Sequence, residues 1–496
     1  MTLLIVEKGG GETMKPIAAV ERLRLKFPGK DTLLFKDLSL TFYEGEKVLL
    51  LGPSGCGKST LLQVLSGLIP NSIDVPMKAE RLQLPTNWGY VFQDPDTQFC
   101  MPFADEEIAF ALENIGVPRS EMHQRIKTLL EKVGLFIEPH TDIHTLSGGM
   151  KQRLALASVL ALDPDVLFLD EPTAMIDEEG TKEIWQTVKR IAKEKTVIIV
   201  EHKIDHVLDF VDRIVLFNDD GEIIADDKAQ TVFANYKDII ASQGIWYPGV
   251  WEEYTAKRRR RSTESGGEKR IYLRQFQGYR SNEVKIHIEE VAVHAGEWIA
   301  VTGKNGAGKS TLLHALMKLI RTDGTYELYG KDSKQLKQLH RLLAFVFQNP
   351  EFQFVTNSVR EELAYSLRLE KRKEDEITET VEGLLRQFHL YEQQDQHPYQ
   401  LSMGQKRRLS VAASIVSGQQ IFLLDEPTFG QDAKNTFALL ELLESYRRQG
   451  TTIIMVTHDE NIVKHFATRR WVIEDGRLVK DESISGQRST AAALFV

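Results

Sequence analysis

Two phosphate-binding loops of one sequence type constrain this chain most. Gly52-Pro-Ser-Gly-Cys-Gly-Lys-Ser-Thr60 follows the apolar run Lys47 to Leu51, and Gly303-Lys-Asn-Gly-Ala-Gly-Lys-Ser-Thr311 follows Trp298 to Val301. Both contain G-x-x-x-x-G-K-[ST], whose glycines let backbone N–H groups surround phosphate oxygens where a helix begins. A loop of this kind directly after a buried strand predicts an α/β nucleotide-binding domain, and its recurrence predicts two such domains.

The loop residues have distinct expected roles. Lys58 and Lys309, which lie 251 residues apart (309 − 58), should reach the β- and γ-phosphates, and the hydroxyls of Ser59 and Ser310 should bind Mg²⁺. An adduct on Cys56 would occupy phosphate space, so we expect a maleimide to inhibit if this thiol is reachable. The other loop residues predicted to bind nucleotide are Gly52, Pro53, Ser54, Gly55, Gly57, Thr60, Gly303, Lys304, Asn305, Gly306, Ala307, Gly308 and Thr311.

An acidic pair follows a later apolar run in each half. These pairs are Asp170-Glu171 and Asp425-Glu426, and each is followed by Pro-Thr. A carboxylate at the end of a parallel strand emerges beside the phosphate loop, so Asp170 and Asp425 are predicted to hold Mg²⁺. The next residues, Glu171 and Glu426, are predicted general bases for the attacking water.

Two serine-glycine motifs precede apolar helical stretches. Leu146-Ser-Gly-Gly-Met-Lys-Gln152 and Leu401-Ser-Met-Gly-Gln-Lys-Arg407 resemble the signature sequence of ATP-binding-cassette ATPases, and the resemblance covers essentially both halves. It implies an α/β protein of two tandem ATP-binding-cassette domains, each with a P-loop parallel-sheet core and an inserted helical subdomain. Charged, helix-prone stretches near residues 104–145 and 358–400 are where we expect these subdomains.

The same resemblance assigns further residues. Gln93 and Gln348 match the family's Q-loop glutamine, which binds nucleotide and Mg²⁺, and His202 and His458 match its catalytic switch histidine. The signature of each half would close on nucleotide held by the other half, so the two domains are expected to pair within one chain. The expected signature contacts are Ser147, Gly148, Gly149, Ser402, Gly404 and Gln405, the D-loop aspartates are Asp177 and Asp432, and the adenine-stacking candidates are Phe27 and Tyr279.

The Q-loop sequences indicate a branch of the family. Gln93-Asp-Pro-Asp-Thr-Gln-Phe99 and Gln348-Asn-Pro-Glu-Phe-Gln-Phe354 are similar to those of ATPases in energy-coupling-factor importers. A single-chain tandem form resembles the ATPases of the thiamine or hydroxymethylpyrimidine systems of bacilli. This resemblance implies two membrane partners, a transmembrane coupling protein and a substrate-binding subunit, and a peripheral position on the cytoplasmic side of the cell membrane.

Composition and the region between the repeats set the expected organisation. We expect domains at residues 15–250 and 271–496, joined by a basic, flexible linker at 251–270 that contains Lys257 to Arg261. This run suits a solvated tether, with attraction to anionic lipid as the alternative. The net charge of −9 argues against nucleic acid as a partner, and two cysteines give no disulfide framework. No segment offers the ~18 apolar residues that a membrane-spanning helix needs.

Two other functions remain open at this stage. A tandem sugar-importer ATPase has a similar length, but such proteins usually have one degenerate half, whereas both halves here keep the lysine, glutamate and histidine. A tandem cassette ATPase that acts on ribosomes or DNA would favour a long charged helical insert or a basic surface. The expected function is therefore ATP hydrolysis that energises uptake of a vitamin or other small nutrient.

Two local features carry further expectations. Acidic residues after the Q-loops, Asp105, Glu106, Glu107, Glu361 and Glu362, could receive basic residues of a membrane partner or could simply stabilise helix N-termini. The signatures also depart from Leu-Ser-Gly-Gly-Gln at Met150 and Met403. If position 403 requires a positive φ, a methionine there stores backbone strain.

Overall fold

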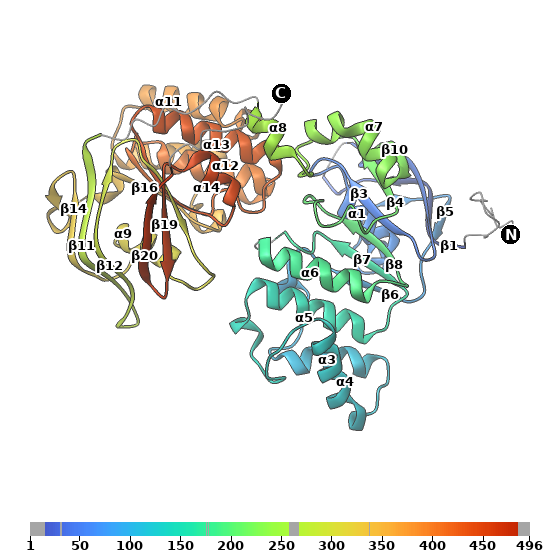
Figure 1. Ribbon diagram of the computed structural model, residues 1–496. Coiled ribbons are helices and arrows are strands. Elements are labelled where there is room, and N and C mark those ends of the chain that lie inside the picture. Colours follow the sequence, from blue (N-terminus) through green and yellow to red (C-terminus); the bar gives the residue numbers. More distant parts are fainter. Residues whose placement is uncertain are drawn as a thin grey trace, which may run out of the picture. The chain divides into compact units, whose positions relative to one another are not determined.

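The computed structural model describes residues 15–29, 32–174, 176, 178–256, 267–336 and 338–484 (Figure 1). The chain forms two compact units, and the main division falls between Val250 and Trp251. No helix within the described ranges is long and apolar enough to cross a membrane. The tandem α/β organisation expected from the two phosphate loops is confirmed.

The core of the first unit is a six-stranded sheet with strand order β10-β9-β3-β8-β7-β6. All neighbouring strands in it are parallel except β9 and β10. The strands β7 and β8 are buried along their whole length, as expected for parallel strands that are covered on both faces. The strand bounds are β3 Lys47–Leu51, β6 Trp88–Val91, β7 Val166–Asp170, β8 Thr196–Val200, β9 Arg213–Phe217 and β10 Ile223–Lys228.

A smaller antiparallel sheet and a group of helices complete the first unit. Helices α3 and α4 pack against α5 and form the helical subdomain expected near residues 104–145 (Figure 1). Their contact is apolar and includes Ile108, Ile126 and Leu154. The small sheet contains β1 Pro16–Leu25, β2 Phe35–Tyr43, β4 Met77–Lys78 and β5 Arg81–Gln83. The helices are α1 Lys58–Leu65, α2 Leu68–Asn71, α3 Ala104–Asn114, α4 Arg119–Lys132, α5 Gly148–Ala161, α6 Glu178–Ile191 and α7 Ala229–Ser242.

The second unit repeats this design in one ten-stranded sheet, β15-β14-β11-β12-β20-β19-β13-β18-β17-β16. Its strands β13, β16, β17, β18 and β19 form the parallel part. The strand bounds are β11 Lys269–Arg280, β12 Glu283–His294, β13 Trp298–Thr302, β14 Thr322–Leu328, β15 Lys331–Asp332, β16 Leu343–Val346, β17 Ile421–Asp425, β18 Thr452–Val456, β19 Arg469–Glu474 and β20 Arg477–Ser483. The helices are α8 Val250–Ala256, α9 Lys309–Leu316, α10 Val359–Leu369, α11 Glu374–Gln387, α12 Met403–Ile415, α13 Ala433–Arg448 and α14 Glu460–Phe466.

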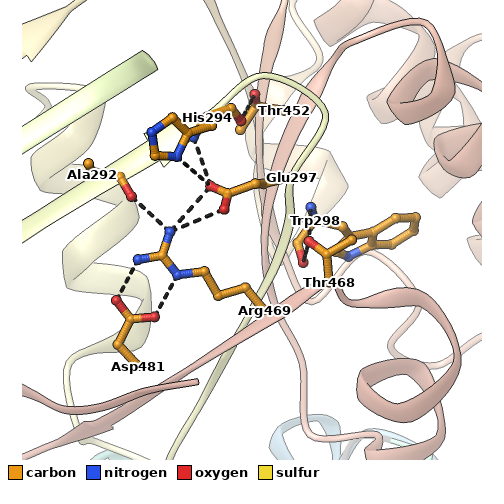
Figure 2. Close-up of polar contacts among 8 residues, drawn as sticks. All are labelled: Ala292, His294, Glu297, Trp298, Thr452, Thr468, Arg469 and Asp481. Atoms are coloured by element: carbon orange, nitrogen blue, oxygen red, sulfur yellow. Dashed lines mark hydrogen bonds and ion pairs between the residues drawn. The ribbon is translucent and has the colours of Figure 1, made fainter. Parts of the chain in front are cut away.

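A half-buried arginine joins sheet elements in each unit. In the second unit, Arg469 of β19 makes a bidentate pair with Asp481 of β20, with two N···O distances of 2.6 Å, and it also contacts Glu297 at 3.2 Å (Figure 2). In the first unit, Arg213 pairs in the same way with Asp226 and contacts Glu46 at 3.2 Å. A fixed planar fork of donors suits such a site, because one side chain can hold several acceptors.

The segment between the halves differs from the expected linker. Residues 251–256 are helical, and the rings of Trp251 and Tyr254 lie 4.9 and 3.9 Å from the ring of Phe437 in the second unit. This aromatic burial makes the first part of the predicted 251–270 linker a piece of the second unit, and β11 begins at Lys269. The basic run at 257–261 lies outside the described residues.

Candidate functional site

Both phosphate loops require glycine where they enter a helix. Gly57 and Gly308 are the N-caps of α1 and α9, with φ of 102° and 106°. A Cβ on Gly57 would lie 2.8 Å from the ring of Phe35, and a Cβ on Gly308 would lie 3.2 Å from the carbonyl oxygen of Lys285. Only glycine combines this left-handed conformation with such a close approach. The loops therefore present helix N-termini, which attract phosphate.

The loop lysines are buried and hydrogen-bonded within their own loops. Lys58 donates to the carbonyl oxygens of Gly52 and Pro53, both at 2.8 Å. Lys309 donates to the equivalent oxygens of Gly303 and Lys304 at 2.9 and 3.0 Å. Each ammonium group is therefore held inside the loop, where its charge can act on a bound phosphate.

A serine hydroxyl and a strand-end aspartate meet in each half. Ser59 Oγ donates to Asp170 Oδ1 at 2.7 Å, and Ser310 Oγ donates to Asp425 Oδ1 at 3.1 Å. Burial raises the pKa of both carboxyls, that of Asp425 to about 6. The neighbouring Lys58 and Lys309 lower these pKa values, but burial outweighs their charge. A divalent cation would add positive charge, so the hydroxyl–carboxylate pairs fit Mg²⁺.

The structure brings the Q-loop glutamine, the second acid and the histidine together in both halves. Glu171 Oε1 lies 3.0 Å from His202 Nε2, and Glu171 Oε2 accepts from Gln93 Nε2 at 2.8 Å. In the second half the corresponding distances from Glu426, to His458 and Gln348, are 3.1 and 3.2 Å. The three residues are far apart in the sequence, and their arrangement in the first half closely matches that in the second.

The two glutamates also share an uncommon backbone conformation. Glu171 has φ of 45° and Glu426 has φ of 47°, a left-handed region that non-glycine residues seldom adopt. Such conformations concentrate at functional sites, where the surrounding structure holds them. Burial alone would raise the pKa of Glu171, but the neighbouring His202 and Lys58 lower it below its ordinary value. The carboxylate is therefore ionised at neutral pH and can accept a proton.

An open pocket of about 670 Å³ lies at the phosphate loop of the second unit. Its lining joins Lys309, Ser310, Gln348 and Glu426, so the predicted contacts of this half share one space. The outer lining also includes Arg280, Val284, Lys285, Asp475 and Gly476, together with the loop residues Asn305, Gly306, Ala307, Gly308 and Thr311.

The two candidates for stacking on adenine, Tyr279 and Phe27, have different surroundings. Tyr279 has its hydroxyl on Gln277 at 2.7 Å and its ring 4.9 Å from the guanidinium of Arg321, and its neighbour Arg280 lines the pocket instead. In the first half, Phe27 is 39% exposed.

The signature motifs begin the helices α5 and α12. Ser147 and Ser402 are the N-caps, and the side chain of Ser402 forms a capping box with Gln405. Met403 is the first residue of α12 and is not among the residues with positive φ, so the condition for backbone strain at this position is not met. Gly148, Gly149 and Gly404 also lie in these helices, and Asp432 directly precedes α13, whereas Asp177 falls outside the described residues.

Three residues with no predicted site role make the two candidate centres different. The hydroxyl of Tyr90 donates to Asp170 Oδ2 at 2.8 Å, whereas the second half has Phe345 in the equivalent strand. Arg407 of α12 is buried near Asp425 and Glu426, and burial lowers its pKa to about 10. Glu201, which precedes His202, is also buried. A position-by-position comparison of the two halves is the sequence signal that finds these residues.

Two phosphate loops, each with a strand-end aspartate and a glutamate–histidine pair on a parallel sheet with a helical subdomain, define a tandem P-loop ATPase. The family model described as "ABC transporter" matches residues 35–174 and 287–429. The chain belongs to this family, whose ATP-binding domains hydrolyse ATP.

Relatives match over nearly the whole chain. The "Putative HMP/thiamine import ATP-binding protein YkoD" of Bacillus subtilis (strain 168) is 34% identical over 94% of this chain and 91% of its own length. A "Putative ABC transporter ATP-binding protein" of Sulfurisphaera tokodaii is 35% identical, covering 93% of this chain and 97% of that protein. An archaeal ribosome recycling factor, solved in complex with a ribosomal stalk protein, superposes with a TM-score of 0.58 at 20% identity, covering 89% of this chain and 86% of that chain. At that identity the likeness shows the fold alone.

Proposed function

We propose that this chain is the ATP-hydrolysing subunit of an energy-coupling-factor transporter that imports a small nutrient, with thiamine or hydroxymethylpyrimidine as the leading candidates. The observation that carries the proposal is the same glutamine–glutamate–histidine geometry in both halves. Two intact centres agree poorly with a tandem ATPase that has one degenerate half. The import protein of Bacillus subtilis supports the substrate class by its name.

The proposed reaction at each centre is attack of water on the γ-phosphate. The loop N–H groups and Lys58 or Lys309 bind the phosphates, and the left-handed Glu171 or Glu426 accepts the proton of the water. The histidine on the other side of each glutamate orients that carboxylate. Ser59, Asp170 and Gln93 would hold Mg²⁺ in the first centre, and Ser310, Asp425 and Gln348 would hold it in the second. The ion would neutralise phosphate charge.

The family resemblance supports a pairing of the two halves within one chain. In this arrangement Ser402, Gly404 and Gln405 complete the centre that contains Lys58, and Ser147, Gly148 and Gly149 complete the centre that contains Lys309. Both signature serines cap helices of 14 and 13 residues, whose N-termini suit a phosphate.

The membrane partner is proposed to dock on the helical subdomains, beside the Q-loops. Phe110 of α3 and Tyr365 of α10 stand 255 positions apart (365 − 110) and are 40% and 44% exposed. The acidic residues contribute less than expected, because Glu107 and Glu362 are buried. Glu107 accepts two backbone N–H groups at 2.9 Å, and Glu362 holds Val355 and Thr356. These hydrogen bonds hold the loops that follow the Q-loop glutamines against α3 and α10.

Uptake by whole cells tests the function. Cells that lack the chain should regain uptake of labelled thiamine or hydroxymethylpyrimidine with the wild-type gene, but not with the Glu171→Gln and Glu426→Gln double variant. Glu106→Lys on α3 should reduce uptake while ATP binding persists, and Glu194→Lys, an exposed acid beyond α6, serves as its control. Uptake of both compounds without the chain would contradict the substrate assignment, and full uptake in Glu106→Lys would contradict this docking surface.

A further inference from the structure

The residue before the histidine differs between the two halves, and its environment differs with it. In the first half it is Glu201, which follows β8 and is 2% exposed. In the second half it is Thr457, which follows β18 and is 3% exposed. A buried carboxylate is costly unless hydrogen bonds compensate it, so the contacts of Glu201 show what it does.

Glu201 connects the turn that carries the catalytic glutamate to the histidine. Thr173 Oγ1 donates to Glu201 Oε1, and the backbone N–H of His202 donates to Glu201 Oε2 at 3.0 Å. Thr173 is buried in the turn after Glu171, where Ala174 N donates to Glu171 O at 3.1 Å. One side chain therefore spans the two segments that bear Glu171 and His202.

The second half holds its histidine in another way. The Thr457 hydroxyl accepts from the backbone N–H of Asp459 at 3.1 Å, so this contact stays within its own loop. Asp459 in turn caps α14, which directly follows. In the first half the carbonyl oxygen of His202 instead accepts from Trp246 N at 3.0 Å. The loop of His202 is thus held by its contacts with Glu201 and Trp246, whereas the loop of His458 leads directly into the capped helix α14.

We propose that Glu201 is a positioning residue specific to the first centre, which keeps His202 Nε2 within 3.0 Å of Glu171 Oε1. The inference rests on the catalytic roles proposed above for Glu171 and His202. Both donors to Glu201 are neutral, so hydrogen bonding rather than charge performs the task. A glutamine can accept the N–H of His202 and donate to the hydroxyl of Thr173, whereas a threonine is too short to reach both.

Histidine NMR tests the positioning directly on the purified chain. With ¹³C-labelled histidine, the signal of His202 is assigned by its loss in His202→Ala, and the signal of His458 by its loss in His458→Ala. Glu201→Gln should leave both signals in place, whereas Glu201→Thr and Glu201→Ala should move or broaden only that of His202. An unchanged His202 signal in the threonine and alanine variants, or an equal change at His458, would overturn the inference.

Hydrolysis measured in a Glu426→Gln background, which leaves Glu171 as the active base, tests the consequence. Glu201→Thr should lower kcat roughly 5- to 10-fold, the effect of about one lost hydrogen bond, and leave KM within about twofold. Glu201→Gln should restore the rate. A raised KM with unchanged kcat would overturn the inference. If the NMR result holds and neither kcat nor KM changes, the positioning stands and the proposed catalytic role of His202 fails.

Discussion

Replacing Glu201 with glutamine should change how the stability of the first unit depends on pH. Burial raises the pKa of this carboxyl from its ordinary 4.5 to about 7. The folded state therefore binds the proton more tightly than the unfolded state. Its contribution to stability is complete below pH 4.5 and is lost as the pH rises through 7. Glutamine cannot ionise, so the variant avoids this loss.

The expected size follows from the shift. About 2.5 pKa units at ~1.36 kcal/mol each give roughly 3 kcal/mol over the whole window, and about 2 to 3 kcal/mol between pH 5 and 8.5. For a unit of this size ~1 kcal/mol moves the melting temperature by about 2 to 4 °C. The difference in melting temperature between Glu201→Gln and the wild type should therefore grow by roughly 5 to 10 °C from pH 5 to pH 8.5. Altered hydrogen bonds in the variant add a difference in melting temperature that is the same at every pH, so they do not change how the difference varies with pH.

Differential scanning calorimetry of both proteins at several pH values measures the slope. Glu46→Gln is the matched control, because Glu46 is equally a buried glutamate of this unit but lies 3.2 Å from Arg213. Removing that charge breaks an ion pair, so the control should melt at a lower temperature than the wild type at pH 8.5. A constant difference between Glu201→Gln and the wild type from pH 5 to 8.5 would refute the reasoning.

Three further outcomes are expected. Glu171→Gln and Glu426→Gln should each slow hydrolysis at their own centre by ~10²- to 10⁴-fold, and the double variant should retain ATP through gel filtration; a single variant that keeps the wild-type rate would contradict two active centres. Cys56 is buried and burial raises its pKa, so peptide mass spectrometry should find maleimide on the exposed Cys100 and not on Cys56 before unfolding. Tyr90→Phe removes a hydrogen bond to a buried carboxylate and should lower the free energy of unfolding by about 1.5 to 3 kcal/mol in urea titrations, whereas no change would show that the bond contributes nothing.

Local sequence was sufficient for much of the fold. The phosphate loops and the strands that end at Asp170 and Asp425 are encoded by short patterns of glycine, apolar and acidic residues. The structure then places Glu171 beside His202, although the two residues are 31 positions apart (202 − 171). That proximity followed from the family resemblance and not from spacing, because it depends on which strands are neighbours.

Features that depend on distant partners were missed. The burial of Glu107 results from a loop that folds back onto α3, so of the two interpretations given for this acid, docking of a partner does not fit. Tyr90 and Glu201 acquire their roles from Asp170 and Thr173, which lie in other segments. Nothing in the local sequence shows these contacts, because only the folded sheet brings the segments together.

Helix α8 determines where the polypeptide can be divided into two genes. Its rings Trp251 and Tyr254 cover Phe437, so a break within the basic run would leave them on the first fragment and uncover apolar surface on the second. A break before Val250 keeps each aromatic contact within one product. If the halves are produced as two separate polypeptides, the second should therefore begin at helix α8 so that both remain soluble.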